Sequence, residues 1–371
     1  MIADTTETRT PAEPSPADDR IDLLGLSRER LAEALAAVVD RPFRARQIYA
    51  ALYERAVRDF SELTELPKDL RARLAERYRI GLPAVATRDE SADGTCKYLF
   101  RLADGATVEA VDIPDRGRRT FCISSQAGCA LACSFCVTGY WGAGRNLTAG
   151  EILGQVLAIR ADRGLAMEGL NLVFMGMGEP LLNLDNVKAA LDILMEWISP
   201  HRITVSTVGI LPGLEAMAGW EKRPNLAVSL HAPTEELRGR IMPVNRTFPL
   251  ADLMPALKRF PLEKGRKITF EYILIRDLND SLREADQLSR LLSGLRAKVN
   301  LIPINPDPVL GPAMAPPDDA RIEAFKERLR QRGWIATVRR RRGDDVSAAC
   351  GQLRASGRDP RGFRPRGKAS G

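Results

Sequence analysis

Residues 120–146 read TFCISSQAGCALACSFCVTGYWGAGRN, a short apolar strand followed by a loop with three closely spaced cysteines. These are Cys129, Cys133 and Cys136, in the spacing C-x3-C-x2-C. Three thiolates from one short loop can each bind one iron of a cubane, which leaves the fourth iron open to a small molecule. The glycines around the cysteines favour a loop that wraps tightly around a group. This stretch therefore predicts a [4Fe–4S] cluster at the end of a β-strand.

Other uses of three close cysteines fit these residues less well. A structural zinc site needs a fourth ligand, and no neighbouring histidine or cysteine continues the pattern. Haem attachment requires a histidine directly after a C-x-x-C pair, but Val137 follows Cys136. The chain has only two histidines, His201 and His231, which disfavours a multi-histidine metal site. Three buried structural cysteines are the remaining alternative.

Strand and helix patterns alternate on the C-terminal side of this loop. Runs typical of buried strands occur at 120–124, 170–175, 203–207, 226–230, 267–273, 298–303 and, as a shorter run, 334–338. Helical periodicity occurs at 149–162, 184–197, 211–220, 281–295 and 317–332. This alternation is typical of a parallel sheet covered by helices. We expect an α/β fold with a partial (β/α)6 barrel, open rather than closed.

A different pattern precedes the cysteine loop. Helical periodicity, interrupted by basic residues, occurs at 28–39, 45–57 and 66–78. Residues 97–102 and 107–113 alternate apolar and polar side chains around a turn at 103–106. These residues predict a small helical domain followed by a β-hairpin.

Composition and charge restrict the class of protein. Residues 321–371 contain 15 Lys/Arg against 5 Asp/Glu, whereas the whole chain has a net charge of +7. Such a basic block suits phosphate contacts with nucleic acid and is equally typical of a solubilising tail. No apolar run approaches the roughly 20 residues that span a bilayer, and the N-terminus lacks the pattern of a signal peptide. Six cysteines without a secretion signal favour metal binding or catalysis in the cytoplasm over a disulfide scaffold.

Five motifs together resemble one family of the radical S-adenosylmethionine superfamily. They are FCISSQAGCALACSFCVTG at 121–139, FMGMGEPLLNLDN at 174–186, SLHAP at 229–233, LIPINP at 301–306 and RGDDVSAACGQL at 342–353. The family is the adenine C2 methyltransferases of ribosomal and transfer RNA, whose near relatives methylate C8 and confer antibiotic resistance. The match extends from about residue 20 to residue 353, and several of its motifs are long and specific to the family.

The resemblance implies two cofactors and the residues that hold them. Cys129, Cys133 and Cys136 would bind a [4Fe–4S] cluster whose open iron holds S-adenosylmethionine. Further contacts to S-adenosylmethionine are implied for Gly178, Glu179, Ser206, Ser229, Leu230, His231 and Asn305. The predicted strands place these residues near strand C-terminal ends, the face that carries the active site in parallel α/β barrels. By itself, each serine or asparagine would be ordinary turn chemistry.

The resemblance also implies three catalytic residues. Cys350 first takes a methyl group from one S-adenosylmethionine. A second S-adenosylmethionine is cleaved reductively to a 5′-deoxyadenosyl radical, which takes a hydrogen atom from the S-methyl group, and the resulting methylene radical adds to adenine. Glu109 is then the proton acceptor, and Cys122 attacks the sulfur of Cys350 to leave a transient disulfide. Radical chemistry is needed because C2 of adenine is too weakly nucleophilic to take a methyl cation directly. Cys96 matches no motif and is expected to be structural.

The combined interpretation divides the chain into six parts. We expect a disordered leader at 1–19, a helical accessory RNA-binding domain at 20–94, a hairpin linker at 95–118, a radical S-adenosylmethionine barrel at 119–343, a mobile cysteine loop at 344–353 and a disordered basic tail at 354–371. The mobility of the cysteine loop is expected because its cysteine must meet two reaction partners.

The expected partners follow from the same resemblance. They are 23S ribosomal RNA at the peptidyl-transferase centre, transfer RNA next to the anticodon, and an external electron donor such as flavodoxin. We expect a monomer that binds no membrane. Three alternatives stay open: methylation at C8, a radical reaction on a substrate other than RNA, and a non-catalytic RNA-binding module with a structural metal. The second predicts that Cys122→Ala and Cys350→Ala retain turnover, and the third predicts zinc rather than iron and sulfide.

Overall fold

The computed structural model describes residues 18–115, 117–339, 342–349 and 351–353. In this part of the chain, ten strands form one sheet in the order β12-β11-β10-β9-β8-β7-β6-β5-β4-β3. The parallel strands are β6 (Arg118–Cys122), β7 (Leu170–Phe174), β8 (Ile203–Thr207), β9 (Asn225–Ser229), β10 (Ile268–Leu274), β11 (Ala297–Pro303) and β12 (Ala336–Val338). Strands β12 and β3 form the two edges of this sheet. The sheet is therefore an open partial barrel, as the sequence predicted.

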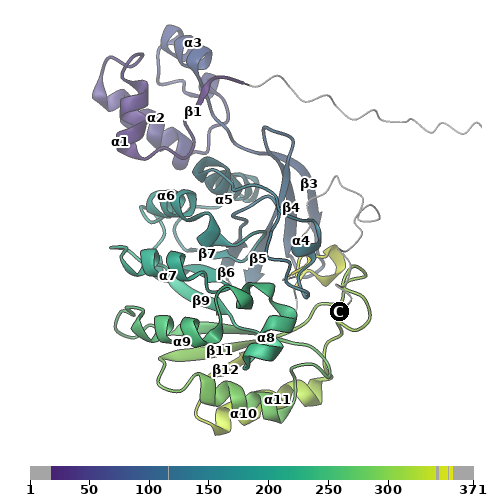
Figure 1. Ribbon diagram of the computed structural model, residues 1–371. Coiled ribbons are helices and arrows are strands. Elements are labelled where there is room, and N and C mark those ends of the chain that lie inside the picture. The colour runs from purple at the N-terminus through teal and green to yellow at the C-terminus, as the bar shows by residue number, and fades with distance from the viewer. Residues whose placement is uncertain (1–17, 116, 340–341, 350, 354–371) are drawn as a thin grey trace, which may run out of the picture.

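Helices alternate with the parallel strands. They are α5 (Ala149–Arg163), α6 (Leu184–Leu194), α7 (Leu211–Ala218), α8 (Glu235–Ile241), α9 (Leu250–Arg259), α10 (Leu282–Leu291) and α11 (Asp319–Gln331). Figure 1 shows most of them stacked along one side of the sheet. Helix α5 begins at a capping box, because the Thr148 hydroxyl accepts a hydrogen bond from the Glu151 N–H and the Glu151 carboxylate accepts one from the Thr148 N–H. Within the described residues, no helix has both the length and the apolar character needed to cross a membrane.

Three antiparallel strands extend the barrel sheet at one edge. They are β3 (Ala84–Glu90), β4 (Cys96–Arg101) and β5 (Thr107–Asp115), and β5 pairs with β6. The predicted hairpin is confirmed as β4 and β5, and it is continuous with the barrel sheet through β6. The sequence did not indicate β3, because nearly all of its residues are exposed and it therefore lacks the apolar alternation of a half-buried strand.

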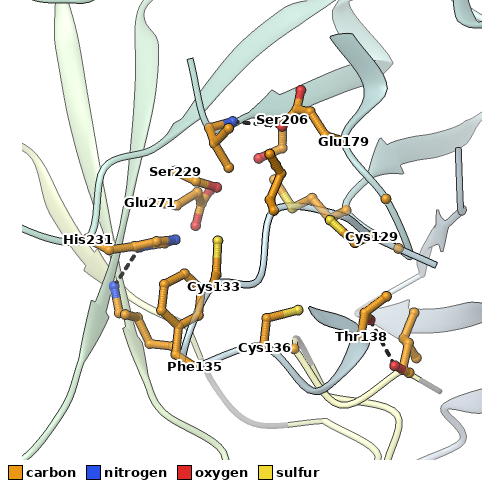
Figure 2. Close-up of a pocket in the computed structure, with 18 of the residues that line it drawn as sticks. Cys129, Cys133, Phe135, Cys136, Thr138, Glu179, Ser206, Ser229, His231 and Glu271 are labelled. Atoms are coloured by element: carbon orange, nitrogen blue, oxygen red, sulfur yellow. Dashed lines mark hydrogen bonds between the residues drawn. The ribbon is translucent and has the colours of Figure 1, made fainter. Parts of the chain in front are cut away.

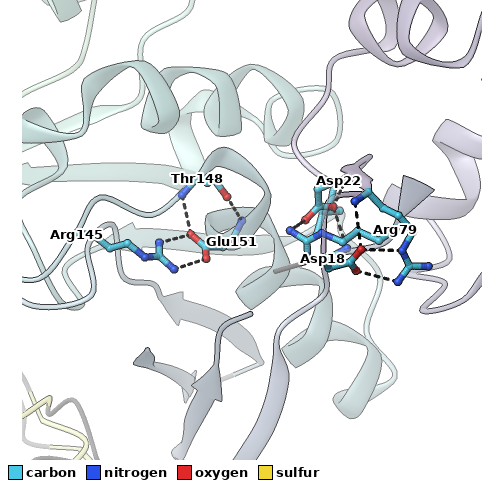
Figure 3. Close-up of polar contacts among 9 residues, drawn as sticks. Asp18, Asp22, Arg79, Arg145, Thr148 and Glu151 are labelled. Carbon is cyan, nitrogen blue, oxygen red and sulfur yellow. Dashed lines mark hydrogen bonds and ion pairs between the residues drawn. The ribbon is translucent and has the colours of Figure 1, made fainter. Parts of the chain in front are cut away.

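The N-terminal residues form a compact helical unit. It contains α1 (Arg28–Leu35), α2 (Pro42–Tyr53) and α3 (Lys68–Arg77), with a short parallel pair of β1 (Ile21–Asp22) and β2 (Tyr78–Arg79). Asp22 pairs with Arg79 at 2.9 Å, beside the capping box of α5 (Figure 3). A Cβ atom on Gly150 would lie 2.3 Å from the Leu24 carbonyl oxygen, so the backbones of this unit and of α5 are in direct contact.

Candidate active site at the cysteine loop

A cavity of about 940 Å³, including its opening to solvent, lies at the C-terminal ends of the parallel strands. It is lined by the three predicted cluster ligands and by five predicted cofactor contacts: Cys129, Cys133, Cys136, Gly178, Glu179, Ser206, Ser229 and His231. Figure 2 shows the three sulfur atoms facing the same space as the side chains of Ser229, His231 and Glu271. The fold thus gathers residues from the ends of strands β7 to β12, from the cysteine loop and from the segment at 351–353 around a single space.

The cysteine loop is held in shape by its own backbone and by neighbouring elements. The Cys129 N–H donates to the Gly142 carbonyl oxygen at 3.0 Å, which closes the loop on itself. The Ser134 N–H donates to the Ile241 carbonyl oxygen at the end of α8, also at 3.0 Å. Arg145 contacts Glu151 at 2.7 Å, which attaches the end of the loop to α5. These contacts preorganise the positions of the cysteines.

The chemistry of the thiols fits a metal cluster. Burial raises the pKa of Cys129 to about 11 and raises the pKa of Cys133 well above its usual value. A bound metal cation favours the thiolate, which offsets this burial effect. Across the described ranges, no three His, Cys, Asp or Glu side chains are close enough to hold one metal ion. Thiols spaced around a cavity suit a polynuclear cluster, in which each sulfur binds a different iron.

The loop after β7 reaches the cavity through close backbone contact. Gly178 has φ 93, and a Cβ atom there would lie 2.4 Å from the Gln126 Cβ. Glu179 is buried, and its carboxylate accepts hydrogen bonds from the Leu181 N–H at 3.0 Å and the Val208 N–H at 2.8 Å. Burial raises the pKa of Glu179 to about 7. Glu179 therefore ties the loop after β7 to the end of β8.

His231 is placed in the cavity wall by an unusual backbone conformation. Its φ is 60, in the left-handed region that non-glycine residues seldom adopt. Its Nδ1 accepts a hydrogen bond from the Ile273 N–H at 3.0 Å, and burial lowers its pKa to about 3. The imidazole is therefore neutral and carries its proton on Nε2, where it can donate to a ligand. The Phe135 ring lies edge-on to it, with centroids 4.6 Å apart.

Two predicted cofactor contacts do not line the cavity. Leu230 is fully buried, and its N–H donates to the Glu271 carbonyl oxygen at 3.1 Å. Successive residues of a strand face opposite sides of the sheet. Because Ser229 faces the cavity, Leu230 faces the helices. Asn305 is also buried, after the end of β11, and is not among the lining residues.

Glu109 and Cys122 lie beside the cavity, on neighbouring antiparallel strands. Cys122 is directly opposite Val111, so Glu109, two residues from Val111, shares its face of the sheet. Both side chains are buried, and Lys97 Nζ lies 3.3 Å from a Glu109 carboxylate oxygen. Cys122 is also in register with Val173, two residues before Met175, which lines the cavity. The two predicted catalytic residues therefore share the concave side of the sheet with the cavity.

Cys350 lies outside the described residues, but the chain on both sides of it is described. On the N-terminal side, Arg342 contacts Asp115 at the end of β5 at 2.7 Å. On the C-terminal side, the Gly351 carbonyl oxygen accepts a hydrogen bond from the Val137 N–H at 2.7 Å, directly after Cys136. Gly351 and Leu353 line the cavity. The transient disulfide of Cys350 with Cys122 stays a prediction, and no disulfide joins two of the described cysteines.

Glu271 on β10 is a cavity residue that the sequence did not reveal. It is in register with Ser229, it is only 4 % exposed, and its Oε2 accepts a hydrogen bond from the Asn300 side chain at 2.7 Å. Burial raises the pKa of its carboxyl group. The only signal in the sequence is one acidic residue within the apolar run ITFEYIL. A carboxylate in such a run requires a buried partner or a ligand.

Two family models match the chain. Residues 123–288 match the radical SAM superfamily, and residues 21–80 match the N-terminal domain of ribosomal RNA large subunit methyltransferases. Among curated proteins, the chain is similar to the dual-specificity RNA methyltransferase RlmN of Anaeromyxobacter dehalogenans, with 47% identity over 93% of this chain and 95% of that protein. The protein of the same name from Geobacter sulfurreducens is 48% identical over 91% of this chain and 93% of its own length.

A solved structure shares the whole fold. The crystal structure of a radical SAM methyltransferase from Sphaerobacter thermophilus matches with a TM-score of 0.85 and 44% identity, over 90% of this chain and 99% of that chain. Identity at this level over nearly the full length shows the family, and the cysteine loop lies within the matched region. The chain belongs to the family of dual-specificity RNA methyltransferases RlmN, within the radical SAM superfamily.

Proposed function

We propose that the chain methylates C2 of adenine in both ribosomal and transfer RNA, using a [4Fe–4S] cluster and S-adenosylmethionine. The observation that carries the proposal is the single cavity that unites the three loop cysteines, the Gly178–Glu179 turn and the residues next to Cys350. The names of the relatives, dual-specificity RNA methyltransferases, support RNA of two kinds as the substrate.

The cavity residues divide between the two cofactors by their chemistry. Cys129, Cys133 and Cys136 hold the cluster as thiolates. The backbone at Gly178 and the Ser206 hydroxyl, which both line the cavity, are suited to the polar methionine end of S-adenosylmethionine. When bound, the two cofactors supply one-electron chemistry that removes a hydrogen atom from a methyl group.

The opposite wall suits the ribose of S-adenosylmethionine. Ser229 and Glu271 are adjacent in register, and among the described residues only Asn300 donates to the Glu271 carboxylate, at Oε2. Its Oε1 is therefore available to accept a hydrogen bond from a ribose hydroxyl. The His231 Nε2–H adds a donor to the same wall.

Three residues of the chain carry the methyl group and release the product. The Cys350 thiolate attacks the methyl carbon of one S-adenosylmethionine; a thioether forms, the sulfonium C–S bond breaks, and S-adenosylhomocysteine leaves. After the thioether carbon has bonded to adenine C2 and one electron has returned from the adduct to the cofactors, Glu109 accepts the proton that leaves C2. Cys122 then attacks the Cys350 sulfur; a disulfide forms, the C–S bond breaks, and its electron pair takes up a proton to complete the methyl group. An external thiol reductant restores both cysteines.

The positions of Glu109 and Cys122 support this sequence of steps. Both are buried on the concave side of the sheet, and the Lys97 ammonium group lies 3.3 Å from a Glu109 carboxylate oxygen, so an opposite charge accompanies the buried carboxyl group. We further propose 23S ribosomal RNA at the peptidyl-transferase centre and transfer RNA next to the anticodon as the substrates. An electron donor such as flavodoxin, a monomeric state and a cytoplasmic location complete the proposal.

The proposal is tested by anaerobic reconstitution with iron and sulfide, followed by turnover with reductant, S-adenosylmethionine and a fragment of large-subunit ribosomal RNA or transfer RNA. Mass spectrometry of the digested RNA and of the Cys350 peptide gives the result. We expect 2-methyladenosine and S-methylated Cys350. Methylation at C8 would show that the enzyme modifies C8 rather than C2. Formation of deoxyadenosine without RNA methylation would show that RNA is not the substrate.

A further inference from the structure

Arg238 is the largest fully buried side chain in the described part of the chain. It lies on α8, whose last residue, Ile241, accepts the hydrogen bond from Ser134 of the cysteine loop. No step of the proposed reaction uses it. A buried guanidinium remains charged and is costly unless an opposite charge or several acceptors compensate it.

The hydrogen bonds of Arg238 reach only neutral oxygens. Its guanidinium donates to the Asn245 side-chain oxygen at 2.7 Å, to the Val208 carbonyl at 2.6 Å and to the Phe248 carbonyl at 3.2 Å. None of the ion pairs among the described residues includes it, and its Nε has no hydrogen-bond partner. The Glu235 carboxylate interacts with Arg238 electrostatically, and the Asn245 amide, which donates to Glu235 at 2.8 Å, links the two groups. The positive charge is therefore not neutralised by direct contact with a carboxylate.

The guanidinium of Arg238 contacts the wall of the cavity that holds the cluster ligands. Val208, whose carbonyl accepts from the guanidinium, is part of the cavity wall together with Cys133. The helix that carries Arg238 also contacts the cysteine loop, because the Ile241 carbonyl oxygen accepts a hydrogen bond from the Ser134 N–H at 3.0 Å, directly after Cys133. The guanidinium therefore lies behind Val208, a residue of the cavity wall, and the cluster would bind on the other side of that wall.

We infer that Arg238 supplies a fixed positive charge behind the cavity wall. This charge stabilises the thiolate-bound cluster and makes the cluster easier to reduce. Reduction adds one negative charge to the cluster, and a fixed positive charge in a region of low dielectric constant favours that state. The inference rests on the proposed cluster, and it assigns a function to a residue outside the cofactor contacts.

The test is the midpoint potential of the cluster in the anaerobically reconstituted full chain, measured by a redox titration followed by electron paramagnetic resonance. Arg238→Met removes the charge and keeps most of the side-chain volume. We expect reduction to become at least tenfold less favourable, a shift of about 59 mV to more negative potential for one electron. Asn245→Asp places a carboxylate in direct contact with Arg238, and it should shift the potential in the same direction without removing the arginine.

Two variants separate charge from structural support. Arg238→Lys retains the charge and should keep the potential near that of the wild type. Arg160→Met removes another buried arginine, which donates to the Glu54 carbonyl at 2.7 Å and contacts the N-terminal unit rather than the cavity. It should lower the melting temperature and leave the potential unchanged.

The outcomes distinguish this inference from the proposed function. Failure of the wild type to bind iron and sulfide would overturn the proposed function itself. A full cluster with unchanged potential in Arg238→Met would overturn the role of Arg238 alone. If Arg238→Met does not fold, Asn245→Asp decides: an unchanged potential there also overturns the inference.

Discussion

Two regions of the molecule contrast in how their polar groups are satisfied. We define the junction as the contact of residues 20–83 with α5, with α6 and with the turn after α6. In the junction, charged side chains lie next to opposite charges. Arg28 pairs with Glu196 at 2.6 Å, and the Tyr49 hydroxyl donates to the same carboxylate at 2.6 Å. At the cavity, Arg238 and Cys133 lie in the protein interior without any such direct pair.

This difference separates a structural region from a functional one. The Arg28–Glu196 pair is complete within the chain, and it helps to position the N-terminal unit beside α5 and α6. In the cavity, burial moves the pKa of Glu179 up to about 7 and the pKa of His231 down to about 3. Clusters of such shifted groups in a cavity are typical of sites whose charges are balanced by bound ligands. The following changes test the contrast, in order of decreasing effect on activity.

Cys133→Ser is expected to abolish cluster binding and RNA methylation, because a hydroxyl group is a poor substitute for a thiolate ligand of iron. Iron and sulfide content after reconstitution, together with methylation, measure the effect. Cys96→Ala is the matched control, since Cys96 is equally buried but lies on β4 outside the cavity lining. An intact cluster in Cys133→Ser would contradict the assigned ligands.

Glu109→Gln is expected to slow RNA methylation by about 10²–10⁴-fold, the usual contribution of a general base. Cleavage of S-adenosylmethionine should continue, because Glu109 does not line the cofactor cavity. A covalent protein–RNA species should therefore accumulate, and denaturing gel electrophoresis detects it. Equal loss of deoxyadenosine formation and methylation would show that Glu109 acts before the adduct.

Glu271→Gln is expected to weaken binding of S-adenosylhomocysteine about tenfold, because a charged acceptor for a ribose hydroxyl becomes neutral. Isothermal titration calorimetry of the reconstituted protein measures this effect without turnover. A ligand that lacks the ribose hydroxyls should bind the variant and the wild type alike. If both ligands lose the same affinity, Glu271 supports the wall and does not contact the ribose.

Gly150→Ala tests the junction and should leave the cluster intact. The added Cβ would meet the Leu24 carbonyl oxygen at 2.3 Å, so we expect a loss of about 1–3 kcal/mol in the free energy of unfolding. Gly239→Ala in α8 is the control, since its nearest contact is 3.8 Å away and alanine favours a helix. Denaturant unfolding should show opposite signs for the two variants.

Local patterns in the sequence were sufficient for many elements and motifs. The predicted strand at 170–175 corresponds to β7 (Leu170–Phe174), and the helix predicted at 149–162 corresponds to α5 (Ala149–Arg163). Strand β7 alternates buried and half-buried residues, and α5 is a long apolar run between a capping box and a glycine, so each could be recognised locally. The exposed strand β3 has no such periodicity and could not be found in this way.

The ligand spacing and the family motifs are properties of the sequence itself. C-x3-C-x2-C places three thiols in one loop in any fold that ends a strand there, and the five motifs indicated the family before any contact was known. Periodicity indicated an open α/β barrel for the same reason: burial of one face imposes a repeat on neighbouring residues.

Only the tertiary structure decided which distant residues share the cavity. Arg238 is a single charged residue within an ordinary segment, and the apolar run ITFEYIL marks Glu271 as unusual without indicating what it faces. Strand register places Glu271 beside Ser229, and the packing of α8 places Arg238 behind Val208. Burial, contact and electrostatic coupling depend on what surrounds a side chain in space, and long-range packing alone sets those surroundings.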